Sequence, residues 1–330
     1  MVNIIVPFYN SEATLEETLA SVEAQTYTDW SVIFIDDGST DSSTAIAQKF
    51  LAKNNGKGKL VQSLKPRSGP AKGRNQAIQN ADGLYIVCLD ADDRLAPFCL
   101  EQRVAVMEKN PVLDWAVFNQ YEWHPGEKKP SRLFNLPAKT RQEAIDYFLK
   151  METTWQTMAP IWKTETIVKL GGFNDSLYPS EDPDIHLRAL LDVNLNMEIC
   201  ASLPPDCYYF VNNKSQDKMH GFYSDSIKSK FRFLKSTIEY LPATVSSEKL
   251  KTYKQYIRIG YFKFMRVFLL SRFKEHAGQF AETTLLLKKT GILSSRDVFK
   301  IKVIYFIFTN NSFIIKGLKL RGLTKFLLQK

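Results

Sequence analysis

The sequence predicts an α/β fold: a mostly parallel open sheet flanked by helices, followed by a C-terminal helical subdomain. Two patterns indicate this. Residues 1–110 alternate short apolar runs with helix-like stretches, as repeated βαβ units do. From Ser226 onward apolar residues recur at helical spacing instead. With 330 residues, 44% of them hydrophobic, the chain is too apolar for a disordered tail and long enough for one large domain with an appendage, or for two domains.

The elements of the sheet region follow in order. Residues 3–7 are the first predicted strand, and a helix begins near Ser11 with Asn10 or Ser11 as its N-cap. The second strand, residues 31–36, is apolar on both faces, as a sheet covered by helices on both sides requires. The remaining predicted elements are strands near 60–63, 84–89 and 113–118 and a helix at 97–108.

The pattern changes after residue 118. Residues 119–139 contain prolines and are expected to form an excursion over the face of the sheet, before a helix at 140–150 and an apolar stretch at 158–162. We therefore divide the chain into residues 1–220, with halves 1–118 and 119–220, and a helical part, residues 221–330. The two apolar helical stripes of that part are Ile227, Phe231, Leu234, Ile238 and Leu241, and Tyr253, Ile257, Tyr261, Phe264 and Phe268.

Charge is distributed unevenly along the chain. Residues 1–220 carry 22 basic and 29 acidic side chains, whereas residues 221–330 carry 22 basic and 6 acidic ones. Residues 298–330 contain seven Lys or Arg and no acid, interleaved with aromatic residues. Such a tail suits an anionic lipid surface, where each cation contributes about 1 kcal/mol. The same charge could hold nucleic-acid phosphates, but the acidic first part would repel them, and we expect no nucleic-acid partner.

The cysteines and the apolar segments indicate the cellular setting. The four cysteines show no CxxC or CxxH spacing, so we expect neither a zinc knuckle nor a disulfide framework, and infer a reduced environment. Met1 leads directly into an apolar strand without the features of a signal peptide. No window reaches the ~18 uninterrupted apolar residues of a membrane span. We therefore expect a cytoplasmic protein that does not cross the bilayer.

Unusual residues follow three of the predicted strands. Ligands of an open parallel sheet bind beyond the carboxyl ends of its strands. Clustered carboxylates repel one another, and a divalent metal removes that cost; oxygen-only ligands favour Mg²⁺ or Mn²⁺ over zinc. The residues concerned are the aromatic segment Pro7-Phe8-Tyr9-Asn10, the pair Asp36-Asp37, and Asp90, Asp92 and Asp93.

The order of motifs over about residues 1–215 resembles the family-2 glycosyltransferases, inverting enzymes of the GT-A fold that use nucleotide-sugar donors. Each motif alone is a weak signal, and all five in family order are a strong one. The segments are Ile5-Val6-Pro7-Phe8-Tyr9-Asn10, Ile35-Asp36-Asp37-Gly38-Ser39-Thr40-Asp41, Gly69-Pro70-Ala71-Lys72-Gly73-Arg74-Asn75, Leu89-Asp90-Ala91-Asp92-Asp93 and Glu181-Asp182-Pro183-Asp184-Ile185-His186-Leu187-Arg188.

The resemblance implies a nucleotide site in the first half of the chain. Pro7 and Tyr9 would line the nucleobase pocket, and Asp37 would accept a hydrogen bond from a pyrimidine imide such as that of uracil. Lys72 and Arg74 would approach the nucleotide, Arg74 with its planar guanidinium and Lys72 as a point charge. A solvated helix start is the alternative for both cations, and a helix-capping turn is the alternative for Asp37.

The resemblance also implies the residues of the reaction itself. Asp92 would hold the ribose or the metal, and Asp93 would coordinate the Mn²⁺ or Mg²⁺ ion that bridges the diphosphate. Asp182 would be the general base that deprotonates the acceptor hydroxyl, and Glu181 would contact the acceptor. The alternative for Asp182 is an ordinary N-cap, because Pro183 suits the first position of a helix.

Several residues near these motifs have structural interpretations. Asp36 is expected to cap a turn, and Asp90 to brace its loop. His186 stands where the family usually has an apolar or aromatic residue, which predicts packing and not metal binding. Trp155 and Trp162 could stack on a sugar, but both are more typical of a core.

The implied function is a hexosyl- or hexosaminyltransferase. It would move a sugar, UDP-linked in the favoured case, to a saccharide or lipid-linked saccharide in bacterial surface-glycan synthesis. The GT-A catalytic domain would be residues 1–220, with a nucleotide-binding half and an acceptor half. The tail, residues 298–330, would hold the protein on the inner face of the plasma membrane. The alternative is a catalytically inactive GT-A-like scaffold that binds nucleotide or glycan; such a protein usually lacks a residue equivalent to Asp93 or Asp182, and both are present here.

Overall fold

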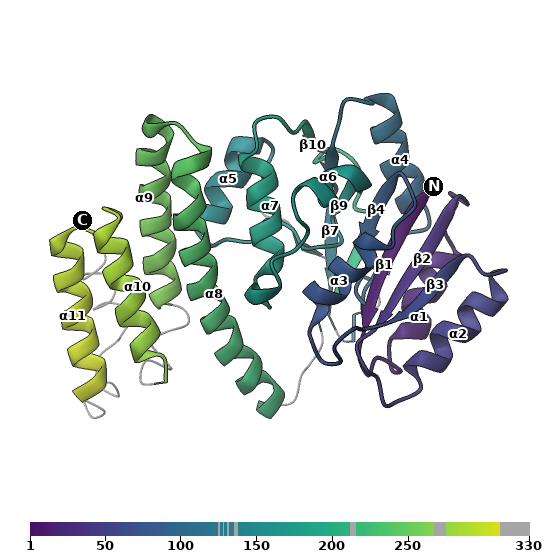
Figure 1. Cartoon of the computed structure of the whole chain (residues 1–330), viewed down its shortest axis with the longest axis horizontal. Coiled ribbons are helices and arrows are strands. Elements are labelled where there is room, and N and C mark those ends of the chain that lie inside the picture. The colour runs from purple at the N-terminus through teal and green to yellow at the C-terminus, as the bar shows by residue number, and fades with distance from the viewer. Residues whose placement is uncertain are drawn as a thin grey trace. The chain divides into compact units, whose positions relative to one another are not determined.

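The computed structural model divides into two compact units (Figure 1). One unit is Met1–Ile145 with Thr153–Ser215, and the other is Asp146–Glu152 with the chain from Gln216 onward. The C-terminal part of the predicted tail, residues 311–330, lies outside the described residues. The structure describes residues 1–124, 126–127, 129–130, 132–134, 138–211, 216–266 and 275–310.

The first unit is built on a mixed sheet whose order is β10-β6-β9-β4-β1-β2-β3. β9 is antiparallel to both neighbours, β4 and β6, and the other neighbouring strands are parallel. This confirms the predicted mostly parallel open sheet. The strands are β1 Val2–Phe8, β2 Trp30–Asp36, β3 Gly58–Gln62, β4 Tyr85–Cys88, β6 Trp115–Val117, β9 Pro160–Lys163 and β10 Met197–Ile199.

Helices cover both faces of this sheet, which is why β1 is buried along its whole length and apolar at every position except Asn3. Val2, Ile4 and Val6 share one core cluster with buried residues of α1, α2 and α4. α3 packs on the opposite face, where Gly73 approaches Pro7 and Ile35 closely. The helices of this unit are α1 Leu15–Glu23, α2 Ser43–Lys53, α3 Pro70–Gln79, α4 Cys99–Lys109, α6 Thr164–Lys169 and α7 Glu181–Leu191, with a 3₁₀ turn, η1, at Asp175–Leu177.

A smaller sheet, of order β5-β11-β7-β8, lies in the same unit. The excursion predicted at residues 119–139 supplies β7 and β8, which join β5 and β11 in this second sheet. Asp206, directly before β11, forms a fully buried ion pair with Arg103 of α4, at 2.7 Å. Arg103 also donates a hydrogen bond to the Met158 carbonyl. The strands are β5 Arg94–Leu95, β7 Gln120–Trp123, β8 Arg132–Leu133 and β11 Cys207–Phe210.

The first helix begins later than predicted. α1 starts at Leu15 with Thr14 as its N-cap, so the proposed capping by Asn10 or Ser11 is wrong. The Ser11 carbonyl instead accepts the N–H groups of Thr14 and Leu15, which forms a turn before the helix. Asn10 has a φ of 48°, and its side chain accepts the Thr40 N–H at 2.8 Å. Both residues therefore shape the loop after β1.

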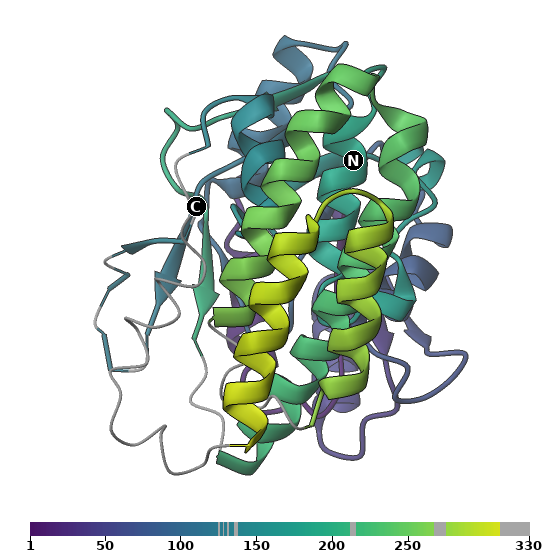
Figure 2. The same ribbon diagram turned by 90° about the vertical axis from the view of Figure 1, so that its left-hand side faces the viewer.

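The second unit is helical, as predicted, and Figure 2 shows its helices running alongside one another. The described members of both predicted stripes are buried; Phe268 lies outside the described residues. The Tyr261 hydroxyl lies 2.7 Å from the Thr284 hydroxyl, and Arg258 pairs with Asp297 at 2.6 Å. The bounds are α8 Gln216–Thr244, α9 Ser247–Phe264, α10 Ala277–Lys289 and α11 Ser295–Asn310, and α5 Arg141–Leu149 runs from the first unit into the second.

Within the described residues, no helix combines the length and the apolar character needed to cross a bilayer. All four cysteines are buried free thiols.

Candidate active site

The candidate site lies at the edge of the large sheet where the parallel strands β1, β2 and β4 end. Phe8 is in register with Asp36 across β1 and β2, and Ile5 with Cys88 across β1 and β4. The segments after these strands therefore leave the sheet at one edge. The structure thus brings together three of the segments that the sequence selected.

Asp37 organises the loop that leads into α3. Its carboxylate accepts the backbone N–H groups of Ser68 at 3.1 Å and Gly69 at 2.9 Å, directly before Pro70 opens the helix. A carboxylate has about four acceptor positions, so these bonds leave capacity for a further donor. Contact with a nucleobase stays a prediction for Asp37.

The neighbouring Asp36 is a structural residue, as predicted. It is buried, and one carboxylate oxygen accepts the Gly38 and Ser39 N–H groups while the other accepts the Thr44 hydroxyl. These bonds hold the turn after β2 and lower the pKa of Asp36 against the opposing effect of burial.

The residues predicted around the nucleobase differ in exposure. Pro7 is buried in β1, whereas the Tyr9 ring is 39% exposed at the strand end. The Arg67 guanidinium lies 5.6 Å from the centre of that ring. Lys72 is exposed on α3, and its Nζ lies 3.8 Å from Asp175 Oδ2. Arg67 was not predicted; its only sequence signal is a basic position shortly before the Gly69-Pro70 helix start.

The aspartates after β4 occupy contrasting environments. Asp93 is 2% exposed, and its Oδ1 accepts the Phe210 N–H at 2.9 Å. Burial, and then the charges of Asp92 and Asp90, raise the pKa of Asp93 well above its usual range. Asp90 instead pairs with Arg74 at 2.6 Å, which agrees with the bracing role predicted for it. Asp93 is therefore a carboxylate whose ionised form needs a nearby cation.

Asp92 and Asp93 fit a divalent cation in chemistry. Their carboxylate oxygens are the ligands that Mg²⁺ and Mn²⁺ prefer, and a bound ion would offset the repulsion that raises the pKa of Asp93. Among the described residues, no group of three or more His, Cys, Asp and Glu side chains could hold a metal by itself. One or two carboxylates with substrate phosphates are a usual Mg²⁺ environment. The residues therefore fit an ion that binds together with a diphosphate.

Arg74 connects the end of β4 to the start of α7. It is 2% exposed; Nη2 lies 2.6 Å from Asp90 Oδ1, and Nη1 lies 3.1 Å from Glu181 Oε1 and 3.7 Å from Asp182 Oδ1. The ring of Phe173 lies 5.3 Å from the guanidinium carbon. The nucleotide contact implied for Arg74 stays a prediction, and the structure shows that its guanidinium binds carboxylates of the protein.

The predicted base lies in the first turn of α7. The helix begins at Glu181 with Ser180 as its N-cap, so the N-cap alternative for Asp182 is wrong. Asp182 Oδ2 accepts the Thr157 N–H at 3.1 Å, and Oδ1 has no hydrogen-bond partner among the described residues. The Asp182 side chain is 23% exposed. The Thr157 N–H thus holds one carboxylate oxygen in place, and the other is buried 3.7 Å from Arg74 Nη1. The role of Asp182 as the base stays a prediction.

Glu181 is the more buried of the two acids. Burial, and then the charge of Asp182, raise the pKa of Glu181 to about 7, although Arg74 acts in the opposite direction. Glu181 therefore takes up a proton near neutral pH beside the carboxylate predicted to be the base.

His186 packs as predicted. Its ring is parallel to that of Trp162 at 6.1 Å, and both residues are buried. Burial lowers the pKa of His186 to about 3, so the ring stays neutral. Trp155 is buried too, in agreement with the core interpretation.

Besides Arg67, sequence reasoning missed three contributions to the site. The backbone N–H groups of Thr157 and Phe210 hold Asp182 and Asp93, and backbone donors carry no residue-type signal. Tyr209, on β11, lies close enough to the aspartates that Asp93 raises its pKa further, after burial. The sequence signal for Tyr209 was only its place in a short aromatic run.

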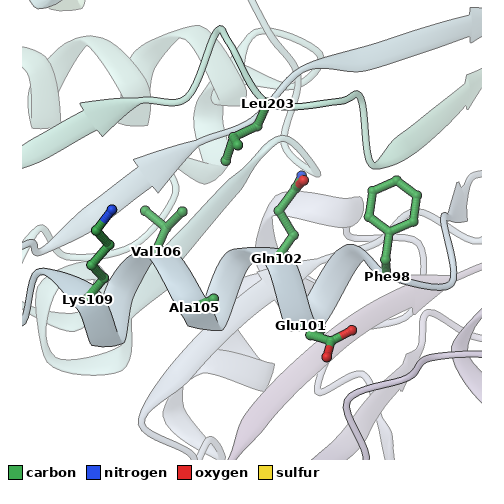
Figure 3. Close-up of a pocket in the computed structure, with 7 residues that line it drawn as sticks. All are labelled: Phe98, Glu101, Gln102, Ala105, Val106, Lys109 and Leu203. Carbon is green, nitrogen blue, oxygen red and sulfur yellow. The ribbon is translucent and has the colours of Figure 1, made fainter.

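An apolar groove lies elsewhere in this unit, along α4 (Figure 3). Phe98, Gln102 and Val106 stand on one side of the helix and point toward Leu203, whereas Glu101 points away. No residue of the predicted site lines this groove. We therefore identify the strand-end carboxylates, and not this groove, as the candidate site.

Comparison with known proteins extends the resemblance. The family model described as Glycosyl transferase family 2 matches residues 3–166. Poly(ribitol-phosphate) beta-N-acetylglucosaminyltransferase TarS of Staphylococcus aureus is 27% identical over 228 residues, which are 67% of this chain and 37% of TarS. UDP-Glc:alpha-D-GlcNAc-diphosphoundecaprenol beta-1,3-glucosyltransferase WfgD of Escherichia coli is 35% identical over 112 residues, 34% of this chain and 43% of that protein. The chain thus spans about two fifths of the length of these relatives.

Solved structures show the same fold. Residues 1–349 of S. aureus TarS, in complex with UDP-GlcNAc, match with a TM-score of 0.65 and 18% identity over 92% of this chain and 86% of that one. Mannosyltransferase PcManGT from Pyrobaculum calidifontis, in complex with GDP-Man and Mn²⁺, matches with a TM-score of 0.52 and 16% identity over 88% of this chain and 84% of that one. The predicted GT-A fold is confirmed. Together with the motif order and the sheet edge described above, the family match shows that the chain belongs to glycosyl transferase family 2.

Proposed function

We propose that this chain is an inverting glycosyltransferase. It would transfer a sugar from a nucleotide-sugar, UDP-linked, to a hydroxyl of a saccharide or lipid-linked saccharide in bacterial surface-glycan synthesis. The observation that carries the proposal is that two kinds of carboxylate lie near Arg74: the buried Asp93, whose ionised form needs a cation, and the partly exposed Asp182, 3.7 Å from Arg74. The activities for which TarS and WfgD are named support the donor and acceptor classes.

The donor would bind in the nucleotide-binding half, residues 1–118. Tyr9 offers an exposed ring for the base beside the buried Pro7, and Asp37 retains acceptor capacity for a pyrimidine imide. Lys72 is exposed on α3 and would attract the diphosphate. When bound, Mn²⁺ or Mg²⁺ would supply positive charge against the charge that grows on the leaving diphosphate, and Asp92 and Asp93 would hold it.

The acceptor would bind in the other half of the catalytic domain, residues 119–220. Asp182 would accept the proton of the acceptor hydroxyl as the hydroxyl oxygen attacks the anomeric carbon from the face opposite the nucleotide. The bond from that carbon to the diphosphate breaks, so the anomeric configuration inverts. The Thr157 N–H keeps Oδ2 in place during this transfer, and Glu181 would contact the acceptor.

The test is release of UDP. The purified chain is incubated with Mn²⁺, UDP-sugars, and either GlcNAc-diphosphoundecaprenol or poly(ribitol phosphate) as acceptor. We expect release with at least one donor and acceptor pair, and loss of release in Asp93→Asn and Asp182→Asn. Water is a further acceptor in this assay. If the chain binds UDP but releases no UDP from any UDP-sugar, it is a binding scaffold, and the proposal is contradicted.

We also propose that the basic helical part, residues 221–330, binds an anionic membrane surface through the tail, residues 298–330. In the described part of this tail, on α11, Phe299 is 69% and Phe306 63% exposed, and Lys302 is exposed on the same side of the helix. Exposed aromatic and basic side chains together favour the interface of an anionic bilayer.

Vesicle flotation tests the membrane proposal. Because Ile301 is buried, deletion of residues 298–310 would damage the helical unit, and surface variants are the better probe. The variant Phe299→Ser with Phe306→Ser should lose binding to phosphatidylglycerol vesicles. Leu285→Ser, a control at a 67% exposed position of α10, should retain it. Equal binding of both variants, or binding to vesicles of phosphatidylcholine alone, would contradict the proposal.

A further inference from the structure

The buried guanidinium of Arg74 contacts carboxylates from two segments that are far apart in the sequence. Asp90 follows β4, whereas Glu181 and Asp182 open α7, 91 and 92 positions later. The distances are 2.6 Å to Asp90, 3.1 Å to Glu181 and 3.7 Å to Asp182. Arg74 is therefore shared between the aspartate segment and the carboxylate predicted to be the base.

The local sequence explains how Arg74 reaches this position. A Cβ at Gly73 would lie 3.3 Å from Ile35 Cγ2, so glycine allows α3 to approach the sheet closely. Asn75 donates to the Phe173 carbonyl at 2.7 Å and accepts the Phe173 N–H at 2.8 Å. Phe173 is thereby held over the guanidinium of Arg74. Gly73 and Asn75, the two neighbours of Arg74 in the chain, together with Phe173 thus keep the guanidinium in its buried position.

We propose that Arg74 is a positioning residue for sugar transfer, which orients Asp182 relative to the aspartate segment and places a positive charge beside the Glu181 and Asp182 carboxylates. The inference rests on the proposed function and gives Arg74 a task other than nucleotide contact. A planar guanidinium can bind several carboxylates with fixed geometry, which a lysine ammonium cannot do equally well.

Burial and the neighbouring charges determine the pKa of Glu181. Burial has the largest effect and raises the pKa of Glu181. The charges of Asp182 and Asp90 raise this pKa further, whereas the charge of Arg74 lowers it. Cys88 and His186 are neutral near pH 7, because burial raises the pKa of Cys88 to about 12 and lowers that of His186 to about 3. Removing the charge of Arg74 therefore moves proton uptake by Glu181 to higher pH.

The experiment compares Arg74→Met and Arg74→Lys with Arg188→Lys. Arg188 is a matched control from α7: it pairs with Asp184 at 2.8 Å and donates to the Leu170 and Gly172 carbonyls, without contact to Glu181 or Asp182. We measure kcat against pH in the UDP-release assay and the affinity for UDP with Mn²⁺ by calorimetry.

For Arg74→Met we expect a fall in kcat of about 10²-fold and an acidic limb that moves to higher pH by about one unit. The affinity of Arg74→Met for UDP should stay within about twofold of the wild-type affinity, because the contacts of the Arg74 guanidinium are to carboxylates of the protein. Arg74→Lys should have a kcat and an acidic limb between those of the wild-type chain and Arg74→Met. It also tests the inference if Arg74→Met does not fold. Arg188→Lys should leave the limb in place. An unmoved limb in both Arg74 variants, or a loss of UDP affinity as large as the loss in kcat, would overturn the inference and favour nucleotide contact.

A direct titration separates this inference from the proposed function. Carboxyl ¹³C NMR, with the Glu181 resonance assigned from Glu181→Gln, follows proton uptake without any donor sugar. Uptake at higher pH in Arg74→Lys or Arg74→Met supports the inference even if no donor is turned over. An unchanged titration curve contradicts it even if the wild-type chain transfers sugar.

Discussion

Replacement of Asp182 by asparagine tests the chemistry of the candidate site with the least structural change. The amide oxygen can still accept the Thr157 N–H, which lies 3.1 Å from Oδ2 in the wild-type chain. The amide nitrogen cannot take a proton from an acceptor hydroxyl. A positioned general base contributes typically 10²–10⁴-fold, or about 3 to 5 kcal/mol of transition-state stabilisation. We therefore expect Asp182→Asn to lower the rate of UDP release by that factor.

Calorimetry and a matched variant complete this test. Affinity for UDP with Mn²⁺ should change by less than about twofold, because the proposed base acts on the acceptor and not on the nucleotide. Asp192→Asn is the control: Asp192 lies at the other end of α7, and its Oδ1 accepts the Asn194 N–H at 3.0 Å. A loss of less than about tenfold in Asp182→Asn, or an equal loss in Asp192→Asn, would refute the assignment of the base.

The remaining predictions concern stability. Because the pKa of Glu181 is raised to about 7, its protonated form stabilises the fold, and this stabilisation is lost as pH rises from about 4.5 through 7. Glu181→Gln should therefore raise the Tm at pH 8 and leave it nearly unchanged at pH 4.5; an equal rise at both would contradict the titration. Gly172→Ala should cost about 1–3 kcal/mol, because φ is 68° and the new Cβ would lie 2.4 Å from Asn75 Oδ1. Arg103→Met should cost about 3–5 kcal/mol by leaving Asp206 buried without its cation. Urea denaturation measures both costs, and a loss below about 0.5 kcal/mol in either variant would be inconsistent with these contacts.

The parts of the fold that were predicted correctly have local causes. β1 and β2 contain the apolar runs at residues 4–8 and 32–35 because helices cover both faces of the sheet, and acidic residues lie at or directly after the ends of β2 and β4. Asp36 was correctly interpreted as a turn residue, since its partners Gly38 and Ser39 are two and three positions away. Contacts between residues a few positions apart can be predicted from the sequence without knowledge of the tertiary structure.

The parts that were not predicted depend on contacts between distant residues. Asp93 is held by the Phe210 N–H, 117 positions later, and Arg74 is shared with Glu181, 107 positions later. The resemblance predicted that Arg74 contacts the nucleotide, with a solvated helix start as the alternative, because nothing near Arg74 in the chain shows that it is buried against carboxylates. The antiparallel direction of β9 and the small sheet containing β11 likewise follow from pairing with remote strands.

Short-range competition explains the errors at helix starts. Ser11 and Asn10 resemble N-caps, but the Ser11 N–H donates to the Ser43 hydroxyl and Asn10 binds Thr40, so the loops after β1 and β2 use them instead. At α7 the helix starts at Glu181, two residues before Pro183, which leaves Asp182 inside the first turn.

The most direct test of the account is the effect of Mn²⁺ on stabilisation by UDP, measured as the shift in Tm for the wild-type chain and for Asp93→Asn. Ligand that binds the folded state adds RT ln(1 + [L]/Kd) to its stability. If Asp93 holds a cation together with the diphosphate, UDP should raise the Tm of the wild-type chain strongly only with Mn²⁺, and the metal-dependent part should vanish in Asp93→Asn. A UDP shift of the same size with and without Mn²⁺, or one unaltered by Asp93→Asn, would contradict the account.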